Sequence, residues 1–132
     1  MSVSAPRFEA VLFDCDGVLV DSEPITHDVL RGMLALDGWS LTREESMRIF
    51  LGKAVKDEAA LIEAKTGRPL TEEWLAAFRE RRNAQLLADL AAIRNVAGAV
   101  AAIHEGFQGR IACASGADMF KVRLQLEKTG LM

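Results

Sequence analysis

The sequence predicts an α/β fold in which a block of helices interrupts a parallel-sheet core. Two short apolar runs, residues 10–13 and 111–114, indicate buried strands. Four amphipathic helical patterns separate these runs, a fifth precedes the second run and a sixth follows it. Because strands that alternate with helices typically pair in parallel, we expect the two strands to share one sheet. Two strands alone make a weak sheet with exposed edges, so a complete core needs further strands.

The first predicted elements are a strand over residues 8–14 and a helix over about 22–37. Ser22 suits the N-cap of this helix, Glu23 its acidic first turn and Pro24 its first helical position. Gly38 suits the C-terminal end because glycine readily adopts the left-handed conformation found there.

Three further helices are predicted before residue 91. Thr42 and Glu45 have the spacing of a capping box, which predicts a second helix closed near Gly52. A third helix is expected over 55–66, and Thr71 caps a fourth. The expected apolar side of that fourth helix consists of Trp74, Leu75, Phe78, Leu86 and Leu87. We therefore expect a helical cap domain over 19–91, inserted between the two pieces, 1–18 and 92–132, of a partial α/β core domain.

The chain then returns to the core. A helix is predicted over 95–105, a strand over 110–114 and a last helix over 117–129 that ends at Gly130.

The segment FDCDGVLVDSE, Phe13 to Glu23, carries the clearest chemical pattern. Side chains alternate along a strand, so Asp14 and Asp16 point to one side and Cys15 to the other. Two carboxylates on one side are costly unless a cation lies between them. In an open α/β sheet, ligands bind at the carboxyl ends of the strands, which is where this pair lies.

This string resembles the signature of the haloacid dehalogenase-like (HAD) phosphohydrolases, and more narrowly of their β-phosphoglucomutase-like branch. The segment Ile111 to Gly116 is similar to the second motif of that family. The resemblance implies a Rossmann-like parallel-sheet core with an inserted helical cap. It also implies a magnesium-dependent phosphatase that works through an aspartyl-phosphate. The implied substrate is a small phosphorylated metabolite of the sugar phosphate or sugar-acid phosphate class.

The resemblance also implies roles for individual residues. Asp14 would be the nucleophile and a side-chain ligand of Mg²⁺, and Asp16 the general acid and base, with its main-chain carbonyl on the metal. Ser115 and Gly116 would bind the phosphate. Lys53 in the cap is a candidate contact for an anionic substrate, but a solvated lysine explains it equally well. Without partners at metal-ligand spacing, the histidines, His27 and His104, are expected to be ordinary surface or helix residues.

Two alternatives to the phosphatase stay open. A phosphomutase is one, although Thr26 and Val55 occupy positions where the mutases usually have histidine and arginine. A non-catalytic fragment or interaction module is the other. The family's third motif, a lysine, and its fourth, an acidic pair, normally lie beyond the second motif, and the chain stops at Met132. Neither Lys121 nor Lys128 matches the context of that lysine, so we expect little turnover by these 132 residues alone.

The amino-acid composition limits which binding partners and which cellular compartment we expect. A net charge of −3 gives no broad basic surface for nucleic acid, and no apolar run approaches the ~20 residues of a membrane span. The cysteines, Cys15 and Cys113, form no disulfide framework, and we expect reduced, buried thiols in a cytoplasmic protein. An exposed sheet edge could form a homodimer.

Overall fold

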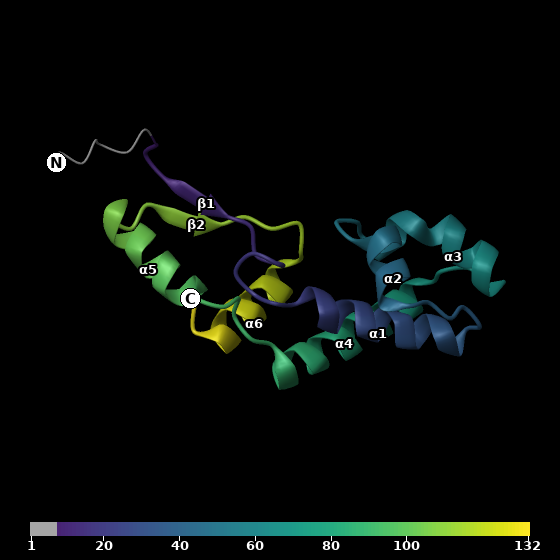
Figure 1. Cartoon of the computed structure of the whole chain (residues 1–132). Helices are drawn as coiled ribbons and strands as arrows, with labels where there is room; N and C mark the ends of the chain where they lie inside the picture. Colours follow the sequence, from purple (N-terminus) through teal and green to yellow (C-terminus); the bar gives the residue numbers. More distant parts are fainter. Residues whose placement is uncertain (1–7) are drawn as a thin grey trace. The chain divides into compact units, whose positions relative to one another are not determined.

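The computed structural model describes residues 8–132, which form two compact units. One unit, here called the α/β unit, contains residues 8–21 and 91–132, and the other, the helical unit, contains residues 22–90. Their elements are labelled in Figure 1. Residues 1–7, which the sequence assigns to the first piece of the core domain, lie outside the described residues. The domain limits expected from the sequence, after residues 18 and 91, stay a prediction.

The α/β unit is built on two short parallel strands. Its elements are β1 (Val11–Phe13), α5 (Val96–Gly106), β2 (Ile111–Cys113) and α6 (Met119–Thr129). Val11 lies opposite Ile111, and Phe13 lies opposite Cys113. The expected parallel pairing is therefore confirmed, with strands shorter than the apolar runs suggested.

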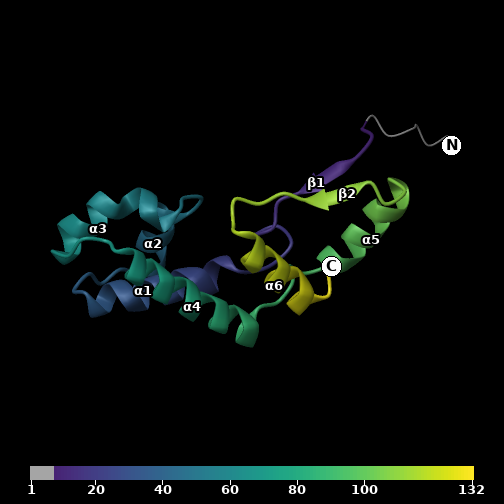
Figure 2. The same cartoon turned by 180° about the vertical axis from the view of Figure 1, so that it is seen from behind.

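Helices cover one face of this strand pair. In Figures 1 and 2, α5 and α6 lie on the same side of β1 and β2. The middle residue of each strand is exposed, and the side chain of Leu12 is 70% exposed, whereas its neighbours in each strand are half-buried. Between the strands and the two helices lies a cavity of about 600 Å³, lined in part by Phe13, Ile111 and Leu126. The covered face is thus only loosely filled.

The helical unit contains five helical elements. They are α1 (Glu23–Leu36), α2 (Arg43–Phe50), the short 3₁₀ helix η1 (Val55–Glu58), α3 (Ala59–Thr66) and α4 (Glu72–Asp89). The capping box of Thr42 and Glu45 is present at the start of α2, as predicted. The Thr71 hydroxyl accepts a hydrogen bond from the backbone N–H of Trp74, so the predicted cap of α4 is also confirmed.

One apolar cluster holds the helical unit together. Its buried members come from the four α-helices of the unit and from the loop between α1 and α2: Leu30, Met33, Leu34, Leu41, Phe50, Ile62 and Phe78. The rings of Trp39 and Phe50 lie 6.1 Å apart, and those of Trp74 and Phe78 stack at 6.0 Å. This unit therefore encloses a core made of its own residues.

Three local predictions need correction. The helix expected over 55–66 is divided into η1 and α3. Leu87, placed on the apolar side of α4, is 54% exposed, because it lies about 100° around the helix from the fully buried Leu86 and so falls outside the buried stripe. Ser22 occupies the N-cap position of α1, but its side chain makes no capping hydrogen bond. Among residues 8–132, every helix is too short or too polar to cross a membrane.

Candidate functional site

The carboxyl ends of β1 and β2 meet at one edge of the sheet. The backbone N–H of Ala114 donates to the carbonyl oxygen of Phe13 at 2.8 Å, which extends the pairing by one residue beyond the strands. Asp14 follows β1 directly, and Ser115 follows β2 after Ala114. The parallel register therefore brings the first and second sequence motifs to the same edge, where open α/β sheets bind ligands.

The loop after β1 separates its side chains as the alternation predicted. Asp14 is exposed, Cys15 is fully buried, and Asp16 is half-buried. The Oδ1 atom of Asp14 accepts a hydrogen bond from the backbone N–H of Cys15 at 2.8 Å. Gly17 has a φ of 74°, and its N–H donates to the carbonyl oxygen of Val20 at 2.9 Å. Because L side chains rarely adopt this conformation, glycine permits the tight turn beside the two carboxylates.

Lys121 is a site residue that the sequence interpretation set aside. Its Nζ atom lies 2.9 Å from Oδ1 of Asp16, although the residues are 105 positions apart. The Lys121 side chain is only 9% exposed, and that of Asp16 is 20% exposed. The sequence context of Lys121 does not match that of the family's lysine, and context alone cannot reveal a contact between distant segments. No local sequence pattern signalled the pair, because the burial of Lys121 follows from the tertiary structure.

Gln125 lies one helical turn after Lys121 and contacts the same loop. It is fully buried, and its Nε2 atom is 3.5 Å from Sγ of Cys15. Burial raises the pKa of the Cys15 thiol from its ordinary 9.0 to about 12, with nearby Cys113 and Asp16 acting in the same direction. Burial also raises the pKa of Cys113. Both thiols are free, and they stay neutral at physiological pH.

The helix that follows the second motif begins two residues later than predicted. Ser115 is half-buried, and its Oγ atom accepts a hydrogen bond from the N–H of Ala117 at 3.0 Å. Helix α6 starts at Met119 rather than 117, because Asp118 is the N-cap and accepts from the N–H of Lys121 at 2.9 Å. Gly116 is exposed in the connecting turn. Ser115 and Gly116 thus stand between strand and helix, and their role in binding phosphate stays a prediction.

The helical unit contains the other residues singled out from the sequence. Lys53 is half exposed, and its ammonium pairs with the Glu58 carboxylate at 3.0 Å. His27 lies in a helix, α1, which is one of the two positions expected for it, but it is buried rather than on the surface. Its Nδ1 atom is 2.8 Å from Oγ of Ser46. His104 is exposed on α5. The substrate role considered for Lys53 stays a prediction.

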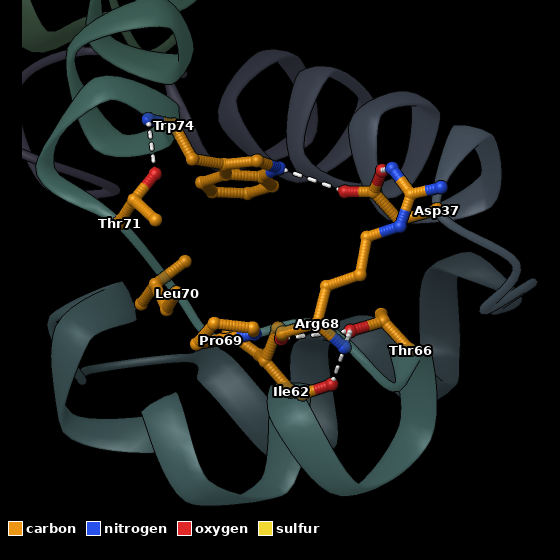
Figure 3. A pocket seen from close by; sticks show the side chains of 8 residues that line it. All are labelled: Asp37, Ile62, Thr66, Arg68, Pro69, Leu70, Thr71 and Trp74. Atoms are coloured by element: carbon orange, nitrogen blue, oxygen red, sulfur yellow. Dashed lines mark hydrogen bonds and ion pairs between the residues drawn. The ribbon is translucent and has the colours of Figure 1, made fainter.

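A second cavity lies within the helical unit. It has a volume of about 350 Å³, and Figure 3 shows the side chains around it. Nε1 of Trp74 donates to Oδ2 of Asp37 at 2.9 Å, and Arg68 pairs with Oδ1 of the same carboxylate at 3.5 Å. These bonds tie the end of α1 to the start of α4 and to the loop before it. The polar groups of Asp37, Arg68 and Trp74 are thus paired with one another, so we assign this cavity a structural role.

The donor chemistry of the loop after β1 fits a hard cation. Carboxylate and carbonyl oxygens suit Mg²⁺, which commonly takes one or two carboxylates and completes its shell with water and substrate phosphate. Asp14 and Asp16 supply such oxygens. Within residues 8–132, no group of three or more His, Cys, Asp or Glu side chains is placed to hold a metal ion. The loop thus supplies oxygen donors of the kind that suit such a cation, without a complete set of side-chain ligands among the described residues.

Comparison with solved structures agrees with this arrangement. A haloacid dehalogenase-like protein of unknown function from Agrobacterium tumefaciens is 28% identical, with a TM-score of 0.78 over 94% of this chain and 54% of that one. A HAD family hydrolase from Deinococcus radiodurans, solved with phosphate and sodium, is 30% identical, with a TM-score of 0.71 over 98% and 55%. The chain therefore spans little more than half the length of these structures.

A more distant structure shows the fold alone. A predicted phosphoglycolate phosphatase from Haemophilus somnus is 19% identical, with a TM-score of 0.72 over 97% of this chain and 60% of that one. No curated protein matches the chain significantly. The sequence profile of the haloacid dehalogenase-like hydrolases matches residues 8–132, nearly the whole chain. With both motifs at the carboxyl edge of a parallel strand pair, the chain belongs to the haloacid dehalogenase-like hydrolase family.

Proposed function

We propose that this chain carries the nucleophile-bearing part of a magnesium-dependent phosphatase. The observation that carries the proposal is the parallel register of β1 and β2, which brings Asp14, Asp16 and Ser115 to one edge of the sheet. Family membership supports the reaction class, and the 30% identical hydrolase with bound phosphate supports an anion as ligand.

The reaction divides between the two aspartates. A carboxylate oxygen of Asp14 attacks the phosphorus atom, and the bond from phosphorus to the substrate oxygen breaks. Asp16 gives its proton to the departing alkoxide. Water then attacks the aspartyl-phosphate while Asp16 takes a proton from it, which releases inorganic phosphate and restores Asp14. The exposed position of Asp14 suits a nucleophile that must reach a substrate in solvent.

Magnesium would be held by the Asp14 side chain and the Asp16 main-chain carbonyl. When bound, it would offset the negative charge of the phosphate. Ser115 and the Gly116 backbone would bind phosphate oxygens at the end of β2. The proposed substrate is a sugar phosphate or sugar-acid phosphate in the cytoplasm, with Lys53 of the helical unit as a candidate contact. A phosphomutase is less well supported, because His27, next to the position of the mutase histidine, is buried against Ser46.

The test is hydrolysis of p-nitrophenyl phosphate by the full 132-residue chain with and without Mg²⁺. Asp14→Asn, which keeps the size of the side chain but removes the nucleophile, is the first variant, and we expect it to lower any turnover by at least about 100-fold. Asp21→Asn is the matched control, because Asp21 is an exposed aspartate outside the proposed roles. Turnover that survives Asp14→Asn would contradict the proposal.

A non-catalytic module is the second candidate. It is motivated by residues 8–132, in which no group of three or more His, Cys, Asp or Glu side chains is placed to hold a metal ion. If the chain shows no turnover above Asp14→Asn, but turnover appears when a polypeptide with the missing lysine and acidic pair is added, the module would be one part of a divided enzyme. Absence of turnover in both assays would favour a binding role.

A further inference from the structure

The ion pair between Lys121 and Asp16 is largely withdrawn from solvent. Its two atoms are 2.9 Å apart, and the side chains are 9% and 20% exposed. Removing an ammonium group from water is costly, and the cost is recovered only where an opposite charge meets it at good geometry. The buried Lys121 ammonium therefore needs the Asp16 carboxylate as its partner. An exposed lysine, by contrast, pairs only weakly with a nearby acid.

Helix α6 presents a pair of polar groups to the loop after β1. Lys121 and Gln125 are four residues apart and thus lie on one face of the helix. Both are buried, the first against Asp16 and the second against Cys15. The exposed lysine of the same helix, Lys128, has no such burial. The helix thereby fixes two consecutive residues of the motif, one through charge and one through a neutral contact.

We propose that Lys121 is the positioning residue of this site: it holds the Asp16 carboxylate in a fixed orientation beside Asp14. It also supplies a positive charge that partly offsets the two carboxylates. This inference rests on the proposed function for the meaning of Asp16, but the ion pair can be tested independently of turnover.

The charge argument predicts an effect on cation binding. The Lys121 ammonium lies at hydrogen-bond distance from an oxygen of Asp16, and its positive charge repels any cation that approaches the acidic loop. If the charge is removed while the side-chain volume is kept, the loop becomes more negative and binds cations more tightly. A lysine that only filled space would affect stability and leave the affinity for cations unchanged.

The experiment measures the dissociation constant for Mg²⁺ alone by isothermal titration calorimetry, on the full chain without substrate. We expect Lys121→Met to tighten Mg²⁺ binding about five- to tenfold, as expected for one unit charge near the ion. Lys121→Arg retains the charge and should stay within about twofold of the parent. In an Asp16→Asn background, Lys121→Met should change the affinity much less than in the parent, because without the Asp16 carboxylate the ammonium is no longer held beside the loop.

Two matched controls separate positioning from folding. Lys128→Met removes an exposed charge from the same helix and should leave both Mg²⁺ affinity and the urea midpoint nearly unchanged. Gln125→Met removes the neutral contact to Cys15, so we expect a lower urea midpoint with unchanged Mg²⁺ affinity. If Lys121→Met does not fold, the Lys121 ammonium is observed in the parent chain by nitrogen-15 NMR. A slowly exchanging signal that is lost in Asp16→Asn supports the pair.

Three results would overturn the proposal. They are equal Mg²⁺ affinities of Lys121→Met and Lys128→Met, the same gain from Lys121→Met with and without Asp16, and a rapidly exchanging Lys121 ammonium in the parent. Failure of the proposed phosphatase would instead appear as hydrolysis of p-nitrophenyl phosphate that survives Asp14→Asn. The outcomes are distinguishable because the cation and NMR measurements involve no turnover.

Discussion

The two units of this protein bury their apolar residues in different ways. In the helical unit, seven buried side chains from helices and loops form one cluster. In the α/β unit, the buried apolar side chains lie mainly in the loop after β1, while the strands are half-buried above a cavity of about 600 Å³. Phe8, Leu12, Met119 and Phe120 of that unit are each more than two-thirds exposed.

The closed apolar core and the proposed site therefore lie in different units. The helical unit encloses its core with its own residues, so most of its packing energy is local. The α/β unit places its tightest packing around the motif that carries Asp14 and Asp16, where Cys15, Leu19 and Val20 are buried. The proposed site is thus held by a well-packed loop in a unit whose sheet is only partly covered.

The largest expected effect comes from opening the core of the helical unit. Leu34 is fully buried in its cluster, so Leu34→Ala should lower the free energy of unfolding by about 2–5 kcal/mol. Leu36→Ala is the control, because Leu36 lies in the same helix and is 77% exposed; we expect a change within about 0.5 kcal/mol. Urea unfolding followed by tryptophan fluorescence reports on this unit, which contains Trp39 and Trp74. Equal losses from both substitutions would contradict the closed core.

A second test sharpens the comparison within the α/β unit. Cys15 is fully buried with a pKa of about 12, whereas Cys113 is half-buried with a pKa raised in the same direction. At pH 8, we expect iodoacetamide to modify Cys113 first and Cys15 only after unfolding in urea. Mass spectrometry of digested protein measures both sites, and Cys113→Ser is the control that should leave the native chain almost unlabelled.

The raised pKa of the Cys15 thiol makes the free energy of unfolding depend on pH. The pKa of Cys15 is higher in the folded state than the ordinary 9.0, so the folded chain keeps its proton where the unfolded chain loses it. The contribution of this thiol to stability is therefore complete below about pH 9 and is lost as the pH rises toward about 12. Urea midpoints measured between pH 8 and pH 10 check this loss of stability. In the iodoacetamide experiment, equal modification of both cysteines at pH 8 would show that the loop after β1 is less tightly packed than described.

The smallest expected effect on stability concerns the uncovered face of the sheet. Leu12 is 70% exposed, so Leu12→Lys should change the free energy of unfolding by no more than about 0.5 kcal/mol. We expect the parent chain to form a homodimer through its sheet edge and Leu12→Lys to shift it toward monomer, because charged residues on edge strands oppose pairing. Sedimentation velocity measures the shift. Leu36→Lys, an equally exposed change in the helical unit, should leave the dimer intact, and a monomeric parent would refute the prediction.

Local sequence signals predicted much of the fold. The capping box at Thr42, the cap at Thr71 and the helix-ending glycine at Gly130 each depend on neighbouring residues, and each is present. Predictions that depended on distant partners were less accurate. His27 has no ligand spacing, yet it is buried against Ser46, which lies 19 positions further along the chain. Leu87 was a misreading of the local pattern, because it lies about 100° around α4 from the fully buried Leu86 and is exposed.

The sequence by itself determined the family motif, the order of strands and helices and the alternation that exposes Asp14 and buries Cys15. These follow from local geometry, because side-chain direction in a strand repeats every two residues. Only the tertiary structure decided that Lys121 meets Asp16 across 105 positions and that Gln125 contacts Cys15. The physical reason is that these contacts join segments more than 100 positions apart, which meet only after β1 and β2 have paired. Local patterns indicate that the strands pair, but not which side chains then come into contact.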